Sequence, residues 1–379
     1  MKIFYWSPFL SNIATIDAVI RSIKSINKFD DKKFYKAYLL DATGEWQTKK
    51  KKIENLNIIK IYKKNFYNYL PKGSFLKSRI SQILIFITCI FKLKSLLKKE
   101  KPNYLIAHLI ISLPLFLFSL NDFKTKLIIR ISGTPKLNFL RKFFWKILSK
   151  GVYKVTCPTL SSLNQLKQLK IFPENKLTLL YDPIISVKEI NKKKKDVIEN
   201  NFEKDKYILS IGRLTKQKNF TLLINAFSEI TKSFPHYNLV IIGDGEERKD
   251  LEKLITFLEL TDKVKLMGYK SNIYNYLDKA YCFISSSLYE DPGFVLIEAG
   301  YSNKLVFAAD SNTGPSEILA KSKRGILYEN DNYEDLVKKF IHSQNMPLDE
   351  KKIKIFNLKK YSSNFTIYKH YKKLVELLD

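Results

Sequence analysis

Cysteine is scarce in this sequence of 379 residues. The three cysteines, Cys89, Cys157 and Cys282, lie far apart in the chain. Such scattered cysteines exclude a disulfide framework or a zinc cluster and are typical of proteins in a reducing cytoplasm. The first residues also lack the charged region, apolar stretch and small-residue cleavage site of a signal peptide. We therefore expect a cytoplasmic protein whose first residues form a strand.

Histidine is scarce too, since the chain has only four, at positions 108, 236, 342 and 370. No Ser/His/Asp triad or cluster of metal ligands can be defended from so few. The sequence also lacks a helix-turn-helix, zinc-finger or RNA-binding signature and a repeat of solenoid period. These absences argue against a metalloenzyme, a triad hydrolase and a repeat protein.

Acidic residues are few in the N-terminal half. Residues 1–187 contain 34 lysines and arginines but only 10 acidic residues, which gives a formal charge of +24. Residues 188–379 contain 32 lysines and arginines and 27 acidic residues, which gives a formal charge of +5. This asymmetry predicts that the N-terminal half meets a polyanion. We favour an anionic membrane surface, worth about 1 kcal/mol per basic residue close to the lipid, over nucleic acid. An AT-rich genome that inflates the lysine count is the alternative explanation.

One long run without charge, residues 102–121, has the length of a membrane span. Ser112 and Pro114 interrupt it, and both residues favour a break in regular structure. The run therefore predicts a buried strand over 104–109 followed by a short helix.

A second apolar stretch, residues 75–99, has an uncharged core at 80–91 that we interpret as too short to span a bilayer. Basic residues lie on both sides of this core. The pattern predicts either a helix lying in the membrane interface or a core helix with a basic outer face. In the first case the residues inserted into lipid would be Phe86, Ile87, Ile90 and Phe91.

The length of the chain indicates two domains. Strand-like runs alternate with helical patterns, which favours an α/β fold with parallel sheets built from βαβ units. A polar, lysine-rich stretch at 188–206 separates two sets of elements. We predict a basic N-terminal domain at 1–187, a second domain at 188–360 and a C-terminal helix within 361–379. The expected strands are 2–6, 36–41, 58–61, 104–109, 127–131, 154–157 and 177–180, then 207–211, 238–242, 264–267, 282–285 and 305–308. The expected helices are 17–28, 137–150, 219–231, 246–259, 273–279, 294–302, 315–320 and 367–378.

Two cations follow the first strand of the second domain. Gly212 and Arg213 come directly after strand 207–211, and Lys218 lies at the start of the next helix. Open α/β sheets bind ligands at the carboxyl ends of their strands, and glycine lets the backbone approach closely. Arg213 and Lys218 could neutralise a diphosphate there, each charge-assisted hydrogen bond contributing about 1.5–3 kcal/mol. Because the chain has 66 basic residues, a solvated loop is the alternative.

Two carboxylates, Glu290 and Glu298, flank a Gly293-Phe294 pair that can start a helix. The exposed N–H groups of the first turn of such a helix would face a phosphate, as helix N-termini do in many anion sites. Glu298 lies one turn further along, and Glu290 lies in the preceding loop. The alternatives are an exposed helix carboxylate and an ordinary loop residue.

These two motifs, in this order and about this far apart, resemble the nucleotide-sugar domain of the retaining family 4 glycosyltransferases (glycosyl transferases group 1). The resemblance covers residues 205–325 and extends to the N-terminal half only in architecture. It implies the GT-B fold, with two doubly wound Rossmann-like domains facing a central cleft and a C-terminal helix that crosses back to the first domain. It also implies that Arg213 and Lys218 bind the diphosphate, Glu290 the donor sugar and Glu298 the ribose.

The same resemblance implies further contacts to the donor from the loops after several strands. Gly243, in a Gly-Asp-Gly sequence that alone is a weak dinucleotide signal, would line the nucleotide site, and residues 268–270 would flank the base. Asp291-Pro292 departs from the glycine of many relatives and would alter the choice of sugar. The full set of donor-binding candidates is Gly212, Gly243, Gly268, Tyr269, Lys270, Gly293, Phe294, Val295 and Glu298.

The N-terminal half departs further from the family. Relatives usually have glycines after the first strand, but residues 7–12 contain none. The histidine that many relatives carry near the fifth strand is also missing from residues 130–134. The candidate acceptor-binding residues are Asn12, His108, Arg130 and Ser132; for His108 a buried, satisfied histidine is an equal alternative.

Together these features predict a retaining glycosyltransferase, a hexosyltransferase that moves sugar from a UDP- or GDP-linked donor to a glycan acceptor. We expect a polyprenyl-diphosphate-linked acceptor in bacterial surface polysaccharide biosynthesis, at the inner face of the cytoplasmic membrane, and no nucleic-acid partner. No cofactor and no metal are expected because Arg213, Lys218 and a helix dipole would stabilise the diphosphate. The alternatives are a nucleotide-sugar epimerase of the same fold and a nucleic-acid-binding protein, which would leave Glu290 and Glu298 unused.

Overall fold

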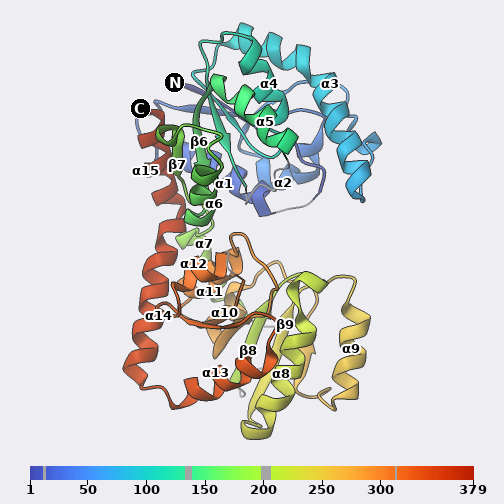
Figure 1. The fold of residues 1–379 in the computed structure, drawn as a ribbon, viewed down its shortest axis with the longest axis vertical. Coiled ribbons are helices and arrows are strands. Elements are labelled where there is room, and N and C mark those ends of the chain that lie inside the picture. Colours follow the sequence, from blue (N-terminus) through green and yellow to red (C-terminus); the bar gives the residue numbers. More distant parts are fainter. Residues whose placement is uncertain (12–13, 133–138, 198–205, 312–313) are drawn as a thin grey trace. The chain divides into compact units, whose positions relative to one another are not determined.

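The computed structural model describes residues 1–11, 14–132, 139–197, 206–311 and 314–379. The chain forms two compact units, unit 1 (Met1–Pro183 with Ile367–Asp379) and unit 2 (Ile184–Thr366). The chain leaves unit 1 at Pro183 and returns to it at Ile367, where the sequence predicted boundaries at 187 and 360. Figure 1 shows both units in sequence colours.

Unit 1 is built on a seven-stranded parallel sheet in the order β3-β2-β1-β4-β5-β6-β7. Its strands are β1 (Lys2–Trp6), β2 (Lys36–Asp41), β3 (Asn57–Lys60), β4 (Tyr104–Ala107), β5 (Lys126–Arg130), β6 (Val152–Cys157) and β7 (Leu177–Leu179). The order runs outward from β1 in both directions. Because crossovers between parallel strands are right-handed, the helices after β1 and β2 lie on one face and those after β3, β4 and β5 on the other.

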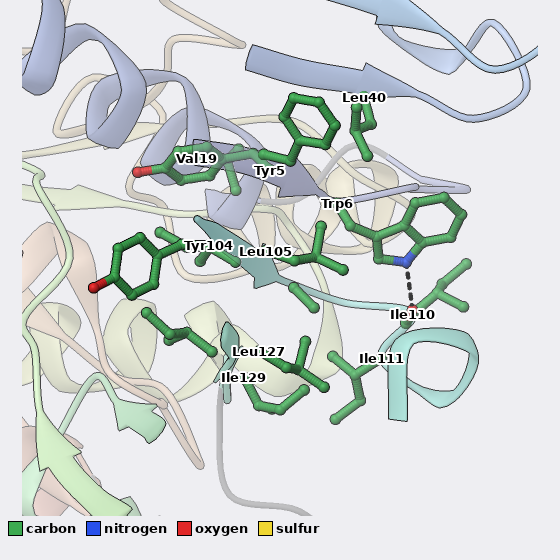
Figure 2. Close-up of a cluster of buried hydrophobic side chains, with 14 of the residues drawn as sticks. Tyr5, Trp6, Val19, Leu40, Tyr104, Leu105, Ile110, Ile111, Leu127 and Ile129 are labelled. Atoms are coloured by element: carbon green, nitrogen blue, oxygen red, sulfur yellow. Dashed lines mark hydrogen bonds between the residues drawn. The ribbon is translucent and has the colours of Figure 1, made fainter. Parts of the chain in front are cut away.

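The central strands of unit 1 are apolar except at their ends, where Lys2, Lys126 and Arg130 lie, as expected for a parallel sheet covered on both faces. Tyr5, Trp6, Leu105 and Leu127 are almost completely buried, and Figure 2 shows them packed together across neighbouring strands. The indole Nε1 of Trp6 donates a hydrogen bond of 2.8 Å to the carbonyl oxygen of Ile110. This bond satisfies the one polar atom that the indole brings into the core.

The last helix, α15 (Ile367–Leu378), belongs to unit 1 and packs on α1 (Ala14–Phe29). The rings of Phe29 and Tyr368 meet edge to face at 5.2 Å. Leu374, Leu377 and Leu378 of α15 are buried in the hydrophobic core of unit 1. The C-terminal helix therefore completes the first unit.

The charge-free run at 102–121 forms strand β4 and helix α4 (Ser112–Leu120), as the sequence predicted. The segment before it forms one long helix, α3 (Phe75–Glu100). Within the described residues α3 is the one helix long and apolar enough to cross a membrane, and 28% of its most apolar window is buried. The interpretation that this segment is too short to span is therefore wrong as a matter of length and composition.

Unit 2 is built on a six-stranded parallel sheet in the order β10-β9-β8-β11-β12-β13. Its strands are β8 (Lys206–Ile211), β9 (Tyr237–Ile242), β10 (Val264–Leu266), β11 (Cys282–Ser285), β12 (Leu305–Asp310) and β13 (Ile326–Glu329). Its longer helices are α8 (Phe220–Ser233), α9 (Arg248–Phe257), α11 (Phe294–Tyr301), α13 (Tyr333–Asn345) and α14 (Leu348–Ser362). Every predicted strand is present in the described residues, so the predicted class, two doubly wound α/β domains, is confirmed.

Candidate functional site

The strand order of unit 2 reverses at β8, the first strand of the unit. Its neighbours are β9, the next strand in the chain, and β11, which is the third strand after β8. The loops that leave β8 and β11 therefore diverge to opposite faces of the sheet and leave a crevice at the carboxyl ends of these strands. Open α/β sheets bind their ligands at this reversal point.

Three glycines bring the backbones of successive loops into contact at this edge. The Gly243 N–H donates to Gly268 O (2.9 Å), and the Gly212 N–H donates to Ile242 O (3.0 Å). A Cβ atom on Gly243 would lie 1.7 Å from Gly212 O, and its φ of +149° also disfavours a side chain. Gly243, a predicted donor-binding residue, is thus required for the close approach of these loops, and the backbone that it approaches is that of Gly212, another predicted donor-binding residue.

Lys218 and Glu290 form an ion pair across the reversal point. Lys218 ends the 3₁₀ turn η5 (Lys216–Lys218) after β8, and Glu290 lies in the loop after β11. The Lys218 Nζ binds Glu290 Oε1, and the side chains are 15% and 11% exposed. Ser287 Oγ donates a second hydrogen bond to the same oxygen, at 2.8 Å. The sequence singled out both charged residues; it did not identify their ion pair or the role of Ser287.

Arg213, the other predicted cation, lies on the same edge but is exposed. Its guanidinium forms no hydrogen bond or ion pair with any residue that the structure describes. A charged group in this setting is available for an anionic ligand at little desolvation cost.

Helix α11 begins at Gly293, which has a φ of +86° and provides no side-chain cap. The first-turn N–H groups, including those of Phe294 and Val295, therefore lack a capping side chain, as in helix termini that bind anions. The preceding loop is held by the Gly314 N–H, which donates to Glu290 O (3.0 Å). A Cβ atom on Gly314 would lie 2.1 Å from Pro292 O, so the Gly314 backbone and this loop pack tightly.

Glu298 lies on α11 one turn after its start and is partly exposed. The Tyr274 hydroxyl donates a hydrogen bond of 2.7 Å to Glu298 Oε1. Tyr274 is itself buried at the start of α10 (Tyr274–Lys279). It thus fixes the direction of the carboxylate, a positioning role that no sequence pattern indicated.

The loop after β10 contains the predicted base-flanking residues. Gly268 has a φ of +66°, and the ring of Tyr269 is largely exposed. Lys270 is half-buried. This loop joins the edge that carries Gly243 through the Gly243–Gly268 backbone bridge.

The predicted acceptor residues of unit 1 lie in a different environment. Arg130 is 3% exposed, and its Nη2 donates to Asp182 Oδ1 at 2.5 Å while Nη1 binds Leu180 O. The prediction that Arg130 contacts an acceptor directly is therefore wrong, because its guanidinium is enclosed by protein. Ser132 is half-buried, and Asn12 lies outside the described residues.

His108 is buried and stacks on Tyr5, with ring centroids 6.2 Å apart. Burial and the nearby Arg130 charge lower the pKa of His108 well below its usual range, so the ring is neutral. Its Nδ1 has no hydrogen-bond partner in the described part of the chain. Because His108 is buried, an acceptor cannot reach its ring from solvent.

The described residues contain no group of three or more His, Cys, Asp or Glu side chains that could hold a metal ion. The charged groups at the edge of unit 2 include the cations Arg213 and Lys218 and the carboxylates Glu290 and Glu298, and Glu290 and Glu298 flank the N-terminus of α11. This arrangement matches the requirements of a nucleoside diphosphate sugar, which presents two phosphates and several hydroxyls.

Comparison with known proteins finds glycosyltransferases. Residues 191–357 match the family Glycosyl transferases group 1, so the chain contains a domain of this family. A curated relative from Campylobacter jejuni, N-acetylgalactosamine-N,N'-diacetylbacillosaminyl-diphospho-undecaprenol 4-alpha-N-acetylgalactosaminyltransferase, is 32% identical over 217 residues. That match covers 55% of this chain and 58% of the relative, so it spans little more than half of either protein.

Two solved structures resemble the whole chain. A glycosyltransferase from Rickettsia africae has a TM-score of 0.75 at 17% identity, covering 100% of this chain and 97% of its own. HepE from Anabaena, solved in complex with UDP, has a TM-score of 0.73 at 14% identity, covering 100% and 99%. At these identities the likeness establishes the fold. The two parallel-sheet domains are those of the GT-B fold class.

Proposed function

We propose that the protein is a retaining glycosyltransferase that transfers a hexose-type sugar from a UDP- or GDP-linked donor to a glycan acceptor. The observation that carries the proposal is the Lys218–Glu290 pair at the reversal point of the sheet, beside the uncapped start of α11. This edge offers positive charge for a diphosphate and carboxylates for hydroxyl groups within one unit of the fold.

The positive groups act on the leaving diphosphate. Charge develops there as the bond to the sugar breaks, and donors fixed in advance stabilise the transition state without reorganisation. Lys218 is held in place by Glu290, Arg213 is open to solvent, and the first turn of α11 contributes about half a positive charge. Removing one such donor typically lowers kcat by about 10²–10³-fold.

The carboxylates orient the donor. Glu290 is anchored by Ser287, so one carboxylate oxygen remains to accept hydrogen bonds from sugar hydroxyls. Glu298, directed by Tyr274, is suited to the ribose. For a retaining transfer, the acceptor hydroxyl attacks the face that the diphosphate leaves, and a diphosphate oxygen accepts its proton. Such a reaction needs no separate general base.

The acceptor is inferred from a relative. The Campylobacter protein acts, by its name, on a saccharide linked through diphosphate to undecaprenol. We infer that this protein likewise extends a polyprenyl-diphosphate-linked oligosaccharide in surface polysaccharide biosynthesis at the cytoplasmic side of the membrane. The UDP complex of HepE supports a nucleoside diphosphate donor.

A nucleotide thermal-shift panel followed by two substitutions tests the proposal. UDP or GDP is expected to raise the melting temperature of the full chain, whereas AMP is not. Arg213→Ala and Lys218→Ala are each expected to lower sugar transfer by about 10²–10³-fold. Lys216→Ala is the matched control, because Lys216 is an exposed lysine of the same turn. Wild-type transfer rates in both site variants, or no stabilisation by either nucleotide, would refute the site.

A further inference from the structure

We propose that unit 1 docks on an anionic lipid bilayer through the outward side of helices α3 and α5 (Phe139–Leu148). This α3–α5 surface consists of Leu76, Ile80, Ile83, Leu84, Ile87, Phe91, Phe143, Phe144 and Ile147, all of them exposed. The inference rests on unit 1 alone. It therefore stands or falls independently of the donor site in unit 2.

Helix α3 is apolar on two opposite sides. Ile85, Cys89, Leu93 and Leu97 follow one another at intervals of four residues and are almost completely buried in the core of unit 1. The exposed apolar residues of α3 recur at intervals of three or four on the other side, ending at Phe91, which is 78% exposed. Packing in the core of unit 1 explains why the first side of α3 is apolar, but it does not explain why the exposed side is apolar too.

The structure corrects the side of α3 that would meet lipid. Of the four residues that the sequence suggested, Ile87 and Phe91 are exposed, but Phe86 and Ile90 pack against the core of unit 1. The docking side is instead extended towards the start of the helix by Leu76, Ile80 and Ile83. An in-plane orientation follows, because crossing the bilayer would require pulling the buried side of α3 out of the core.

Helix α5 extends the same surface. Helices α3, α4 and α5 follow β3, β4 and β5 and cover one face of the sheet, with α4 packed against both of its neighbours. The Phe86 and Phe116 rings join α3 to α4 at 5.4 Å. Figure 1 shows these three helices together in unit 1. Their outward sides therefore belong to a single face, on which α5 places two phenylalanines and Ile147.

The charge around the α3–α5 surface selects the partner. Residues 55–150 contain 19 basic residues but only two acidic ones, Glu100 and Asp122. Glu100 forms an ion pair with Lys2 at 3.0 Å. Exposed basic residues alternate with the apolar ones on the two helices themselves, and one more, Lys150, lies in the turn directly after α5. Those on the helices are Lys77, Arg79, Lys92, Lys98, Lys99, Lys142 and Lys146. Apolar residues flanked by lysines are typical of segments that lie in an anionic membrane interface.

Other occupants fit this chemistry less well. A nucleic-acid interface is polar and wet and uses apolar side chains only as single wedges between bases, so it would leave most of this apolar surface without a partner. A second copy of the chain, related by two-fold symmetry, would place one basic surface against the other. A lysine-rich genome alone does not explain the asymmetry, since residues 188–379 carry 32 basic residues with 27 acidic ones.

Vesicle flotation of the full chain tests the proposal, with phosphatidylcholine vesicles compared with phosphatidylcholine–phosphatidylglycerol vesicles. We expect binding to the mixed vesicles that decreases as salt is raised. The charge variant Lys98→Glu/Lys99→Glu should lower the partition coefficient by at least about 25-fold, since each basic residue near the surface contributes about fivefold.

The apolar part has a matched control. Phe91→Ser is expected to lower the partition coefficient by at least about tenfold. Phe257→Ser, which removes a phenylalanine that is 81% exposed on α9 of unit 2, is expected to leave it unchanged. Circular dichroism and thermal melting of both variants show whether each is folded, which exposed positions should permit.

Four results would overturn the proposal. The first two are no binding to either kind of vesicle and equal binding to both kinds. The third is an equal loss of vesicle binding in Phe91→Ser and Phe257→Ser. The fourth is vesicle binding that resists alkaline carbonate extraction, as the binding of a spanning helix does. Loss of DNA binding or of dimerisation by Phe91→Ser, with vesicle binding intact, would assign the surface to that other partner. Nucleotide-induced stabilisation of Phe91→Ser reports on the donor site separately.

Discussion

The two units share a topology but place their charged groups in opposite ways. Both have a doubly wound parallel sheet whose strand order runs outward from the first strand. At the carboxyl edge of unit 2, Arg213 is exposed and Lys218 is half-buried, and Lys218 pairs there with the buried Glu290. Unit 1 buries Arg130, His108 and His370 inside the domain. Both units therefore provide a carboxyl edge of a parallel sheet. Whether a charged residue on this edge can bind a ligand or only stabilises the fold depends on how far it is buried.

The clearest way to test this contrast is to compare Arg130, the last residue of β5, with Arg213, which comes two residues after β8. Arg130→Ala leaves Asp182 buried without its cation, and breaking such a pair costs about 3–5 kcal/mol of stability. Arg213→Ala removes an exposed side chain and should change stability by less than about 0.5 kcal/mol. Urea unfolding followed by circular dichroism measures both units, and tryptophan fluorescence reports on unit 1 separately, because Trp6, Trp46 and Trp145 all belong to it. Equal unfolding midpoints for the two variants would contradict the contrast.

The pH dependence of stability should also distinguish the units, because both buried histidines lie in unit 1. Burial lowers the pKa of His370 to about 4. The folded state therefore keeps His370 neutral, and unfolding takes up a proton below the ordinary pKa of about 6.5. The contribution of His370 is complete above that value and is lost as the pH falls towards 4. At about pH 5 the loss is about 2 kcal/mol.

His370→Gln isolates this effect. The neutral ring donates from Nδ1 to Tyr181 O at 2.7 Å, so its Nε2 accepts from Ser22 Oγ at 2.8 Å. Glutamine cannot titrate, so the stability difference between wild type and variant should narrow by about 2 kcal/mol between about pH 7.5 and pH 5. Tryptophan-monitored urea unfolding gives this difference. A difference independent of pH would show that folding does not lower the pKa of His370.

The smallest expected effect is in unit 2 and refines the donor site. Tyr274→Phe removes the hydrogen bond to Glu298, which is worth about 0.5–1.5 kcal/mol. If Glu298 binds the ribose, UDP should bind about two- to tenfold more weakly, as measured by calorimetry. Tyr333→Phe, at the start of α13, is the control and should not change the affinity. An unchanged dissociation constant for Tyr274→Phe would mean that the direction of Glu298 is immaterial.

Most elements of the fold could be predicted from the sequence because apolar runs and helix starts leave local signals. Helix α13 was missed although it carries them: the Asn332 side chain caps the helix at Asp335 N, and Leu336 and Phe340 form a buried pair four residues apart. Helix α14 offers a weaker signal because Ile353 and Phe356 are exposed, so its apolar residues form no single stripe. Strand β13 is only four residues long and was also missed.

The candidate site was only partly predictable. Lys218 and Glu290 were each identified from their position after a strand, but their pairing depends on the adjacency of β8 and β11, which no local pattern encodes. Arg130 was suggested as an acceptor contact from its place in the stretch where relatives carry a histidine, and its burial was not foreseen because its partner Asp182 lies 52 residues further along the chain. The sequence indicates where a strand ends, but it does not indicate which distant segment will pack over the residues at that end.

The closing of unit 1 by α15 has a consequence for synthesis. Ser22 and His370 are 348 residues apart, and all of unit 2 lies between them in the chain. The ribosome therefore releases the whole of unit 2 before the last part of the unit 1 core exists. Since domains fold as they emerge from the ribosome, unit 2 can fold before Leu374, Leu377 and Leu378 of the unit 1 core have been synthesised. The domain that is begun first is thus completed last.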